Sequence, residues 1–212
     1  KTTEMRTVIQ SILAIAVLLL AYLLFESIQE PIRFNREVKK REDATIQKLK
    51  DIRTAEEFYK AKFGIYTGSF DTLISFVKYD SLPIIRAIGS IPDSLYDLGV
   101  TEKKAIEMGI IIRDTSFVSV LDSIFPPKYK IDSLSFVPYA GQEQFFLGAA
   151  ELETASKVKV KVFEAHVLNN VLLHGLDRQL VINYNADREK IVGFKGLKVG
   201  SLEASTNNAG NW

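Results

Sequence analysis

Candidate catalytic and metal-binding side chains are few in this chain, and they are scattered along it. Its 212 residues include two histidines and no cysteine, which excludes thiolate metal sites, disulfides and thiol catalysis. His166 and His174 are eight residues apart, so a strand would present both on one side, where Glu164 or Asp177 could complete a metal site. Their contexts, A-H-V and L-H-G, are those of ordinary strand and turn residues, and we expect no metal ion.

The carboxylates and the sequence motifs likewise give no indication of a catalytic site. Asp114, Asp122 and Asp132 fall in predicted strands and turns, and no sequence feature brings two of them together as an acid–base pair would require. Phosphate-binding loops, dinucleotide-binding glycines, the nucleophile elbow and the H-E-x-x-H zinc motif are absent from the sequence. Aromatic residues do not interleave with a basic cluster, as single-strand nucleic-acid binding would need. We therefore predict a chain that is not an enzyme, uses no cofactor, has no evident small-molecule substrate and binds no nucleic acid.

The most regular charged pattern is K-V-K-V-K-V over residues 157–162. It places Lys157, Lys159 and Lys161 on one face of a strand and three valines on the other. Such a lysine face could bind phosphate or an acidic glycolipid. A solvated sheet face explains it equally, because its like charges discourage edge-to-edge pairing. The total charge, 27 basic against 26 acidic residues, indicates no partner.

The element that must position everything else is the apolar run near the N-terminus. Nineteen uncharged residues extend from Thr7 to Phe25, and a helix of that length spans about 28 Å, close to the thickness of a bilayer core. The alternatives are a cleaved signal peptide and a buried core helix. The run is longer than the apolar part of a signal, and no A-x-A site follows it. We predict a transmembrane anchor over residues 1–30.

Four small residues in this run would let a neighbouring helix approach closely. They are Ser11, Ala14, Ala16 and Ala21. The expected partners are therefore the lipid bilayer and other membrane or envelope proteins, with self-assembly included.

Residues 31–64 are predicted to form a juxtamembrane helical stalk. Pro31 predicts a kink at the membrane surface, residues 32–63 contain no glycine or proline, and Gly64 is placed to end the helix. Five basic residues in the stalk could contact lipid head groups, or could simply be solvated. They are Arg33, Arg36, Lys39, Lys40 and Arg41.

Residues 65–204 are predicted to form an α+β domain, followed by a polar, poorly ordered tail at 205–212. Expected helices cover residues 69–77, 102–108 and 177–190. Expected strands cover residues 110–120, 129–137, 144–152, 157–162 and 196–202, with residues 80–99 irregular. Because the strands follow one another without long intervening helices, we expect an antiparallel sheet on which the long helix packs.

The run D-I-R-T-A-E-E-F-Y-K-A-K-F-G-I-Y-T-G-S-F-D-T-L over residues 51–73 resembles type IV pilins and type II secretion pseudopilins. In that family an apolar N-terminal helix continues into an amphipathic half and ends in an aromatic turn, here Tyr59, Gly64 and Tyr66. The resemblance covers residues 7–78. The family's maturation site, a glycine followed by Phe-Thr-Leu-Ile-Glu, has no counterpart in K-T-T-E-M-R.

This resemblance implies a single-pass protein of the bacterial inner membrane whose C-terminal domain is periplasmic. The basic residues after the span would by themselves place that domain in the cytoplasm, and the resemblance decides against this. We expect a pilin-like structural subunit of an envelope assembly that acts through helix packing and domain docking. The alternative is a membrane-tethered periplasmic binding or adaptor domain of a transport, secretion or motility complex.

Overall fold

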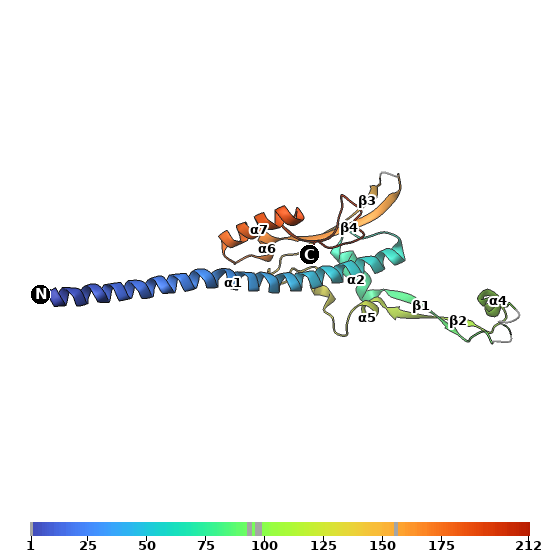
Figure 1. The fold of residues 1–212 in the computed structure, drawn as a ribbon. Coiled ribbons are helices and arrows are strands. Elements are labelled where there is room, and N and C mark those ends of the chain that lie inside the picture. The colour runs from blue at the N-terminus through green and yellow to red at the C-terminus, as the bar shows by residue number, and fades with distance from the viewer. Residues whose placement is uncertain (1, 93–94, 96–98, 155–156) are drawn as a thin grey trace.

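A computed structural model describes the chain except for residues 1, 93–94, 96–98 and 155–156. It confirms the α+β class and the long apolar helix at the N-terminus (Figure 1). The elements in chain order are α1 Thr2–Phe63, α2 Phe70–Tyr79, β1 Ser81–Ile88, α4 Glu102–Glu107, β2 Ile112–Ser119, α5 Val120–Ile124, the 3-10 helix η1 Ile131–Ser133, β3 Phe146–Glu153, β4 Lys159–Leu168, α6 Asn169–Leu172, α7 Arg178–Val192 and β5 Gly196–Gly200.

Helix α1 is the axis of the molecule. Its 62 residues correspond to about 93 Å, and the helix continues through Pro31 without interruption. Figure 1 shows no sharp bend, so the predicted kink is not observed; proline removes one backbone donor and leaves the rest of the helical ladder intact. Gly64 ends the helix as predicted, with a left-handed φ of 73° and its N–H donating to the carbonyl of Lys60 at 2.7 Å.

The second half of α1 lies in the hydrophobic core, as expected for its last turns, and the charged segment Lys39–Asp43, which was expected to be solvated, is also held against the domain through Arg41 and Glu42. Burial begins at Phe34, only nine residues after Phe25, and Leu49 and Ile52 are completely buried. Val38 is buried four residues after Phe34, and Leu49, Ile52 and Ala55 follow at three-residue spacing, so these residues form one side of the helix, which packs on β4 and β5. Residues 31–64 therefore belong to the domain.

The main sheet has three antiparallel strands in the order β3-β4-β5. Strand β4 is central, and its register places Phe146 opposite His166 and Glu164 opposite Gly200. Gly200 has a φ of 73°, and a Cβ there would lie 2.1 Å from the carbonyl oxygen of Phe163, so only glycine fits this close crossing. The strands predicted at 144–152, 157–162 and 196–202 correspond to β3, β4 and β5.

A second, separate sheet corrects the expectation of one continuous sheet. Strands β1 and β2 pair from Ser81↔Ser119 to Ile88↔Ile112, and this ribbon extends away from the main body towards α4 (Figure 1). Strand β1 lies in the region predicted to be irregular because of Pro83, which a two-stranded ribbon tolerates at its edge. The strand predicted at 129–137 is instead η1 and the isolated bridge between Phe136 and Gln144.

The C-terminal tail is also different from its prediction, because residues 205–212 are held against the domain. Asn207 and Asn208 both have positive φ, and the N–H of Ala209 donates to Thr206, which defines a type I′ turn. The turn folds the tail back onto β5, where Val199 bridges Gly210. The side chain of Asn208 then donates to the hydroxyl of Tyr66 at 2.9 Å.

Deleting residues 205–212 is expected to destabilise the domain by about 2 kcal/mol, since several hydrogen bonds of about 1 kcal/mol each are lost against a partial gain in chain entropy. Asn208→Ala alone should cost about 1 kcal/mol. Urea unfolding followed by circular dichroism of the full chain in detergent measures both. An unchanged midpoint for the deletion would mean that the tail contributes nothing to folding.

Candidate functional site

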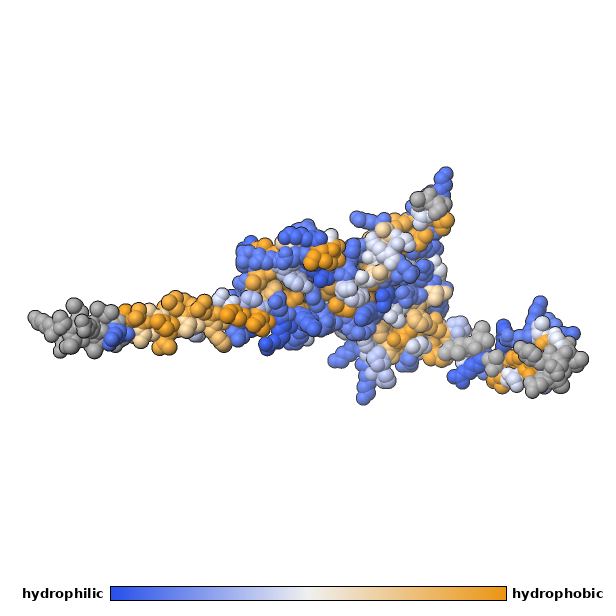
Figure 2. All heavy atoms as spheres, viewed as in Figure 1, coloured by the Kyte–Doolittle hydropathy of each residue, from blue (hydrophilic) through white to orange (hydrophobic). Residues whose placement is uncertain are grey.

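The largest candidate functional surface is the apolar half of α1, which projects beyond the domain (Figure 2). The described side chains from Ile12 to Phe25 are mostly exposed, and this helix is long and apolar enough to cross a membrane. The helix turns about 100° per residue, so Ala14 and Ala21 lie on one face and Ala16 lies on the opposite face. Ser11, the fourth predicted packing residue, lies outside the side chains that the structure describes.

The five basic residues that were predicted to contact lipid head groups have different surroundings in the structure. Arg33 pairs with Glu26 at 3.6 Å, and Lys40 lies 5.0 Å from the centre of the Tyr139 ring. Arg36 and Lys39 are exposed.

Arg41 has a structural role in place of the predicted head-group contact. Its Nη1 donates to the carbonyl oxygens of Leu172 and His174, at 3.1 and 2.9 Å, and its Nε donates to Glu37 at 3.1 Å. Only 13% of the side chain is exposed. Arg41 therefore ties α1 to the end of α6.

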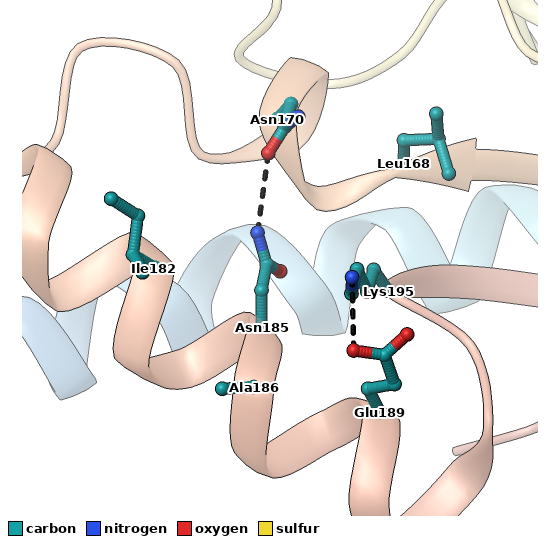
Figure 3. A pocket seen from close by; sticks show the side chains of 7 residues that line it. All are labelled: Leu168, Asn170, Ile182, Asn185, Ala186, Glu189 and Lys195. Carbon is teal, nitrogen blue, oxygen red and sulfur yellow. Dashed lines mark hydrogen bonds and ion pairs between the residues drawn. The ribbon is translucent and has the colours of Figure 1, made fainter.

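An open hollow of about 360 Å³ lies between the end of β4, α6 and α7 (Figure 3). Asn185 on α7 connects the two asparagines of α6: its Oδ1 accepts from Asn169 at 2.8 Å and its Nδ2 donates to Asn170 at 3.2 Å. Glu189 and Lys195 form an ion pair of 2.9 Å at the other end. The asparagine hydrogen bonds fasten α6 to α7, and the ion pair joins α7 to the residue that precedes β5.

One buried acid stands out among the described residues. Glu56 lies on the buried face of α1 and is completely inaccessible to solvent. Its Oε2 accepts a hydrogen bond from the backbone N–H of Thr67 at 3.0 Å, which links α1 to the turn that follows it. Burial, offset only in part by this bond, raises the pKa of Glu56 to about 8, so the carboxyl group is protonated at neutral pH.

Glu56→Gln is expected to remove a pH dependence from folding. The folded-state pKa of about 8 exceeds that of an unfolded chain, so the wild-type protein loses stability as the pH rises from about 4.5 to 8. The variant should gain about 2–4 kcal/mol relative to wild type between pH 5 and pH 8. Urea unfolding at both pH values measures this, with the exposed Glu107→Gln as control. Parallel pH profiles for wild type and Glu56→Gln would contradict the assignment.

Two tyrosines add further polar contacts that hold the domain on α1. Tyr129 donates to Asp51 and Tyr184 donates to Glu42, each at 2.6 Å. Burial and the adjacent carboxylate raise the pKa of Tyr184 to about 12, so its hydroxyl keeps its proton. Sequence reasoning missed these pairs because the partners are more than 70 residues apart; Glu56 could have been found, since it follows Leu49 and Ile52 at helical spacing.

The two histidines do not meet. The Nδ1 of His166 lies 2.7 Å from Oε1 of Glu164, and its ring stacks on Phe146 at 4.6 Å. His174 lies beyond α6, where its carbonyl accepts from Arg41, and the side chain of Asp177 caps α7 by accepting from the N–H of Leu180. In the described part of the chain, no group of three histidine or carboxylate side chains is placed to hold a metal ion.

The remaining candidates are dispersed over the surface. Asp114 lies on β2, Asp122 on α5, and Asp132 pairs with Lys78 from η1. In the lysine pattern of residues 157–162, Lys159 on β4 pairs with Glu151 on the neighbouring strand β3 at 3.2 Å. These side chains lie on separate elements, so the structure does not assemble them into one site.

Comparison with protein-family models, with curated proteins and with solved structures finds no match to this chain.

Proposed function

We propose that this chain is a single-pass, membrane-anchored structural subunit of a bacterial envelope assembly, pilin- or pseudopilin-like in architecture. It acts through packing of α1 in the bilayer and through docking of its α+β domain, which we place on the periplasmic side of the inner membrane. The observation that carries the proposal is α1 itself. One unbroken helix has an exposed apolar half suited to lipid and a second half that is the centre of the domain core.

The connection between anchor and domain supports a mechanical role. Between Phe25 and Phe34, the first buried residue among the described side chains of α1, there are eight helical residues and a rise of about 14 Å. Arg41 and the Tyr184–Glu42 pair then hold α6 and α7 against the same helix. A push or a rotation applied to the helix in the membrane would therefore reach the domain without passing through a flexible linker.

A membrane-tethered adaptor is the second candidate, and the β1–β2 ribbon favours it. The ribbon carries exposed apolar side chains, among them Phe117 at 70% exposure and Ile112 at 60%. A ribbon of two strands cannot bury these residues by itself, and a partner protein would cover them.

Two measurements in one bacterial host test the proposal. Protease treatment of spheroplasts should cleave the domain without lysis, because we place it outside the cytoplasm. The chain contains no cysteine, so single cysteines at Ala14, Ala21 and Phe117 can report neighbours by crosslinking in intact membranes. Crosslinks from Ala14 and Ala21 support the structural subunit, and crosslinks from Phe117 alone support the adaptor. Protection of the domain until lysis would reverse the proposed topology.

A further inference from the structure

The stretch of α1 that leaves the membrane has an apolar side and a polar side. Ile28 and Ile32 are 64% and 47% exposed, and they lie on the helix about 100–140° away from the face that Phe34 and Val38 bury in the domain. On the opposite flank, Glu26, Gln29, Glu30 and Arg33 fall within about 100° of one another. Helical geometry therefore separates an apolar stripe from a polar stripe over residues 26–33.

Two exposed cations continue the apolar stripe. Lys39 points in nearly the same direction as Ile28 and Ile32, about 10 Å beyond Ile32 along the helix axis. Arg36 lies between Ile32 and Lys39 along that axis. Arg33, by contrast, is paired with Glu26, and Arg41 is held by the domain. Arg33 and Lys40 are exposed as well, but they lie on the polar side of the helix, so Arg36 and Lys39 are the basic side chains at the end of the apolar stripe.

From this geometry we infer that α1 leaves the bilayer obliquely, with the Ile28–Ile32 stripe lying in lipid and Arg36 and Lys39 contacting anionic head groups. The inference rests on the proposed membrane anchor and deepens it. From Val8 to Ile32 the helix measures about 36 Å, which exceeds the hydrocarbon thickness of about 30 Å, and a longer span is accommodated by tilting. A tilt of the helix axis by roughly 30–40° from the bilayer normal brings Glu26, on the polar side of the helix, and Ile32, on its apolar side, to a similar depth in the membrane.

Lipid fits this stripe better than a second copy of the chain does. The stripe continues the apolar surface of the membrane span, and long basic side chains at its end can extend to lipid phosphates. A symmetric pair of chains packed through the same stripe would bring Arg36 and Lys39 against their own counterparts, and like charges in contact are repulsive. The tilt also lifts the domain, which lies on the far side of α1, away from the membrane surface.

Single-cysteine accessibility tests the inference in the full chain. Proteins with Ile28→Cys, Ile32→Cys, Glu30→Cys or Arg33→Cys are reconstituted in phosphatidylethanolamine–phosphatidylglycerol vesicles and exposed to a membrane-impermeant maleimide from the domain side. Cysteines at positions 28 and 32 should react about tenfold more slowly than those at 30 and 33, because lipid covers them. Leu18→Cys measures the anchor independently.

Three results overturn the inference and are distinguishable. Equal, fast reaction at all four positions with a protected position 18 means that the helix is upright and only the tilt is wrong. Fast reaction at position 18 as well means that α1 is not in the membrane, so the proposed function fails too. Slow reaction at position 32 that coincides with a disulfide-linked dimer means that a second copy covers the stripe.

A matched pair of charge variants tests the head-group contacts. Arg36→Gln with Lys39→Gln should speed labelling of Ile32→Cys about fivefold in phosphatidylglycerol-containing vesicles and have little effect in phosphatidylcholine. Arg33→Gln with Lys40→Gln removes the same charge from the polar side and should change the rate less. Equal effects of the two pairs in both lipids would contradict the head-group contacts.

Discussion

Two aspartates at the centre of the apolar run, Val17→Asp with Leu18→Asp, are expected to keep α1 out of the bilayer. On the insertion scale each exchange costs about 3–4 kcal/mol, because an acidic residue replaces an apolar one at the centre of the span. The pair therefore costs about 6–8 kcal/mol, whereas the twelve Leu, Ile, Val and Phe residues of the run supply only about 5 kcal/mol. Carbonate extraction and flotation of membranes measure the result.

The control for this pair is Val17→Leu with Leu18→Ile, which keeps the run apolar and should remain in the membrane fraction. A double-aspartate variant that still floats with the vesicles would show that this helix is not what holds the chain to the bilayer.

Leu49→Ala is expected to destabilise the domain by about 3 kcal/mol. Leu49 lies on α1 and is completely buried in the cluster that also contains Phe163 and Leu197, so its removal combines lost burial with a cavity. Had residues 31–64 formed a solvated stalk, the same change would have cost almost nothing, since alanine is an excellent helix former. Urea unfolding of the full chain in detergent distinguishes these cases.

The neighbouring exposed residue provides the control, because Lys50→Ala changes the same helical turn on its solvent side and should shift stability by less than about 0.5 kcal/mol. Equal effects of the two alanine substitutions would contradict the placement of α1 in the core.

Local patterns predicted much of the secondary structure. The spacing of Phe70, Leu73 and Val77 predicted α2, and the alternation over residues 157–162 predicted β4, although the strand begins two residues later than expected, at Lys159. Gly64 and Gly109 end helices as expected, and each has a left-handed φ. Ser69 and Thr101 stand at the predicted N-cap positions of α2 and α4, although neither side chain makes the capping hydrogen bond. These outcomes depend on residues within one or two turns of each other.

Other predictions failed where distant residues decide the structure. The charged segment Lys39–Asp43 reads as solvated, yet Arg41 and Glu42 meet carbonyl and tyrosine partners more than 130 residues away. The polar composition of residues 205–212 indicated disorder, but β5 and Tyr66 offer this tail enough hydrogen bonds to hold it. Pro83 likewise concealed β1, whose strand conformation depends on pairing with β2.

The long apolar helix at the N-terminus and the α+β class could be predicted from the sequence, because hydrophobic periodicity and helix breakers act over a few residues. The folded structure was needed to show that burial of the described part of α1 begins as early as Phe34, that the sheet is split in two, and that Glu56 is buried and protonated. It also shows that, of the five basic residues between Arg33 and Arg41, only Arg41 is drawn into the domain. Each of these depends on which remote surface packs against α1, and burial and charge pairing across such distances are properties of the folded chain.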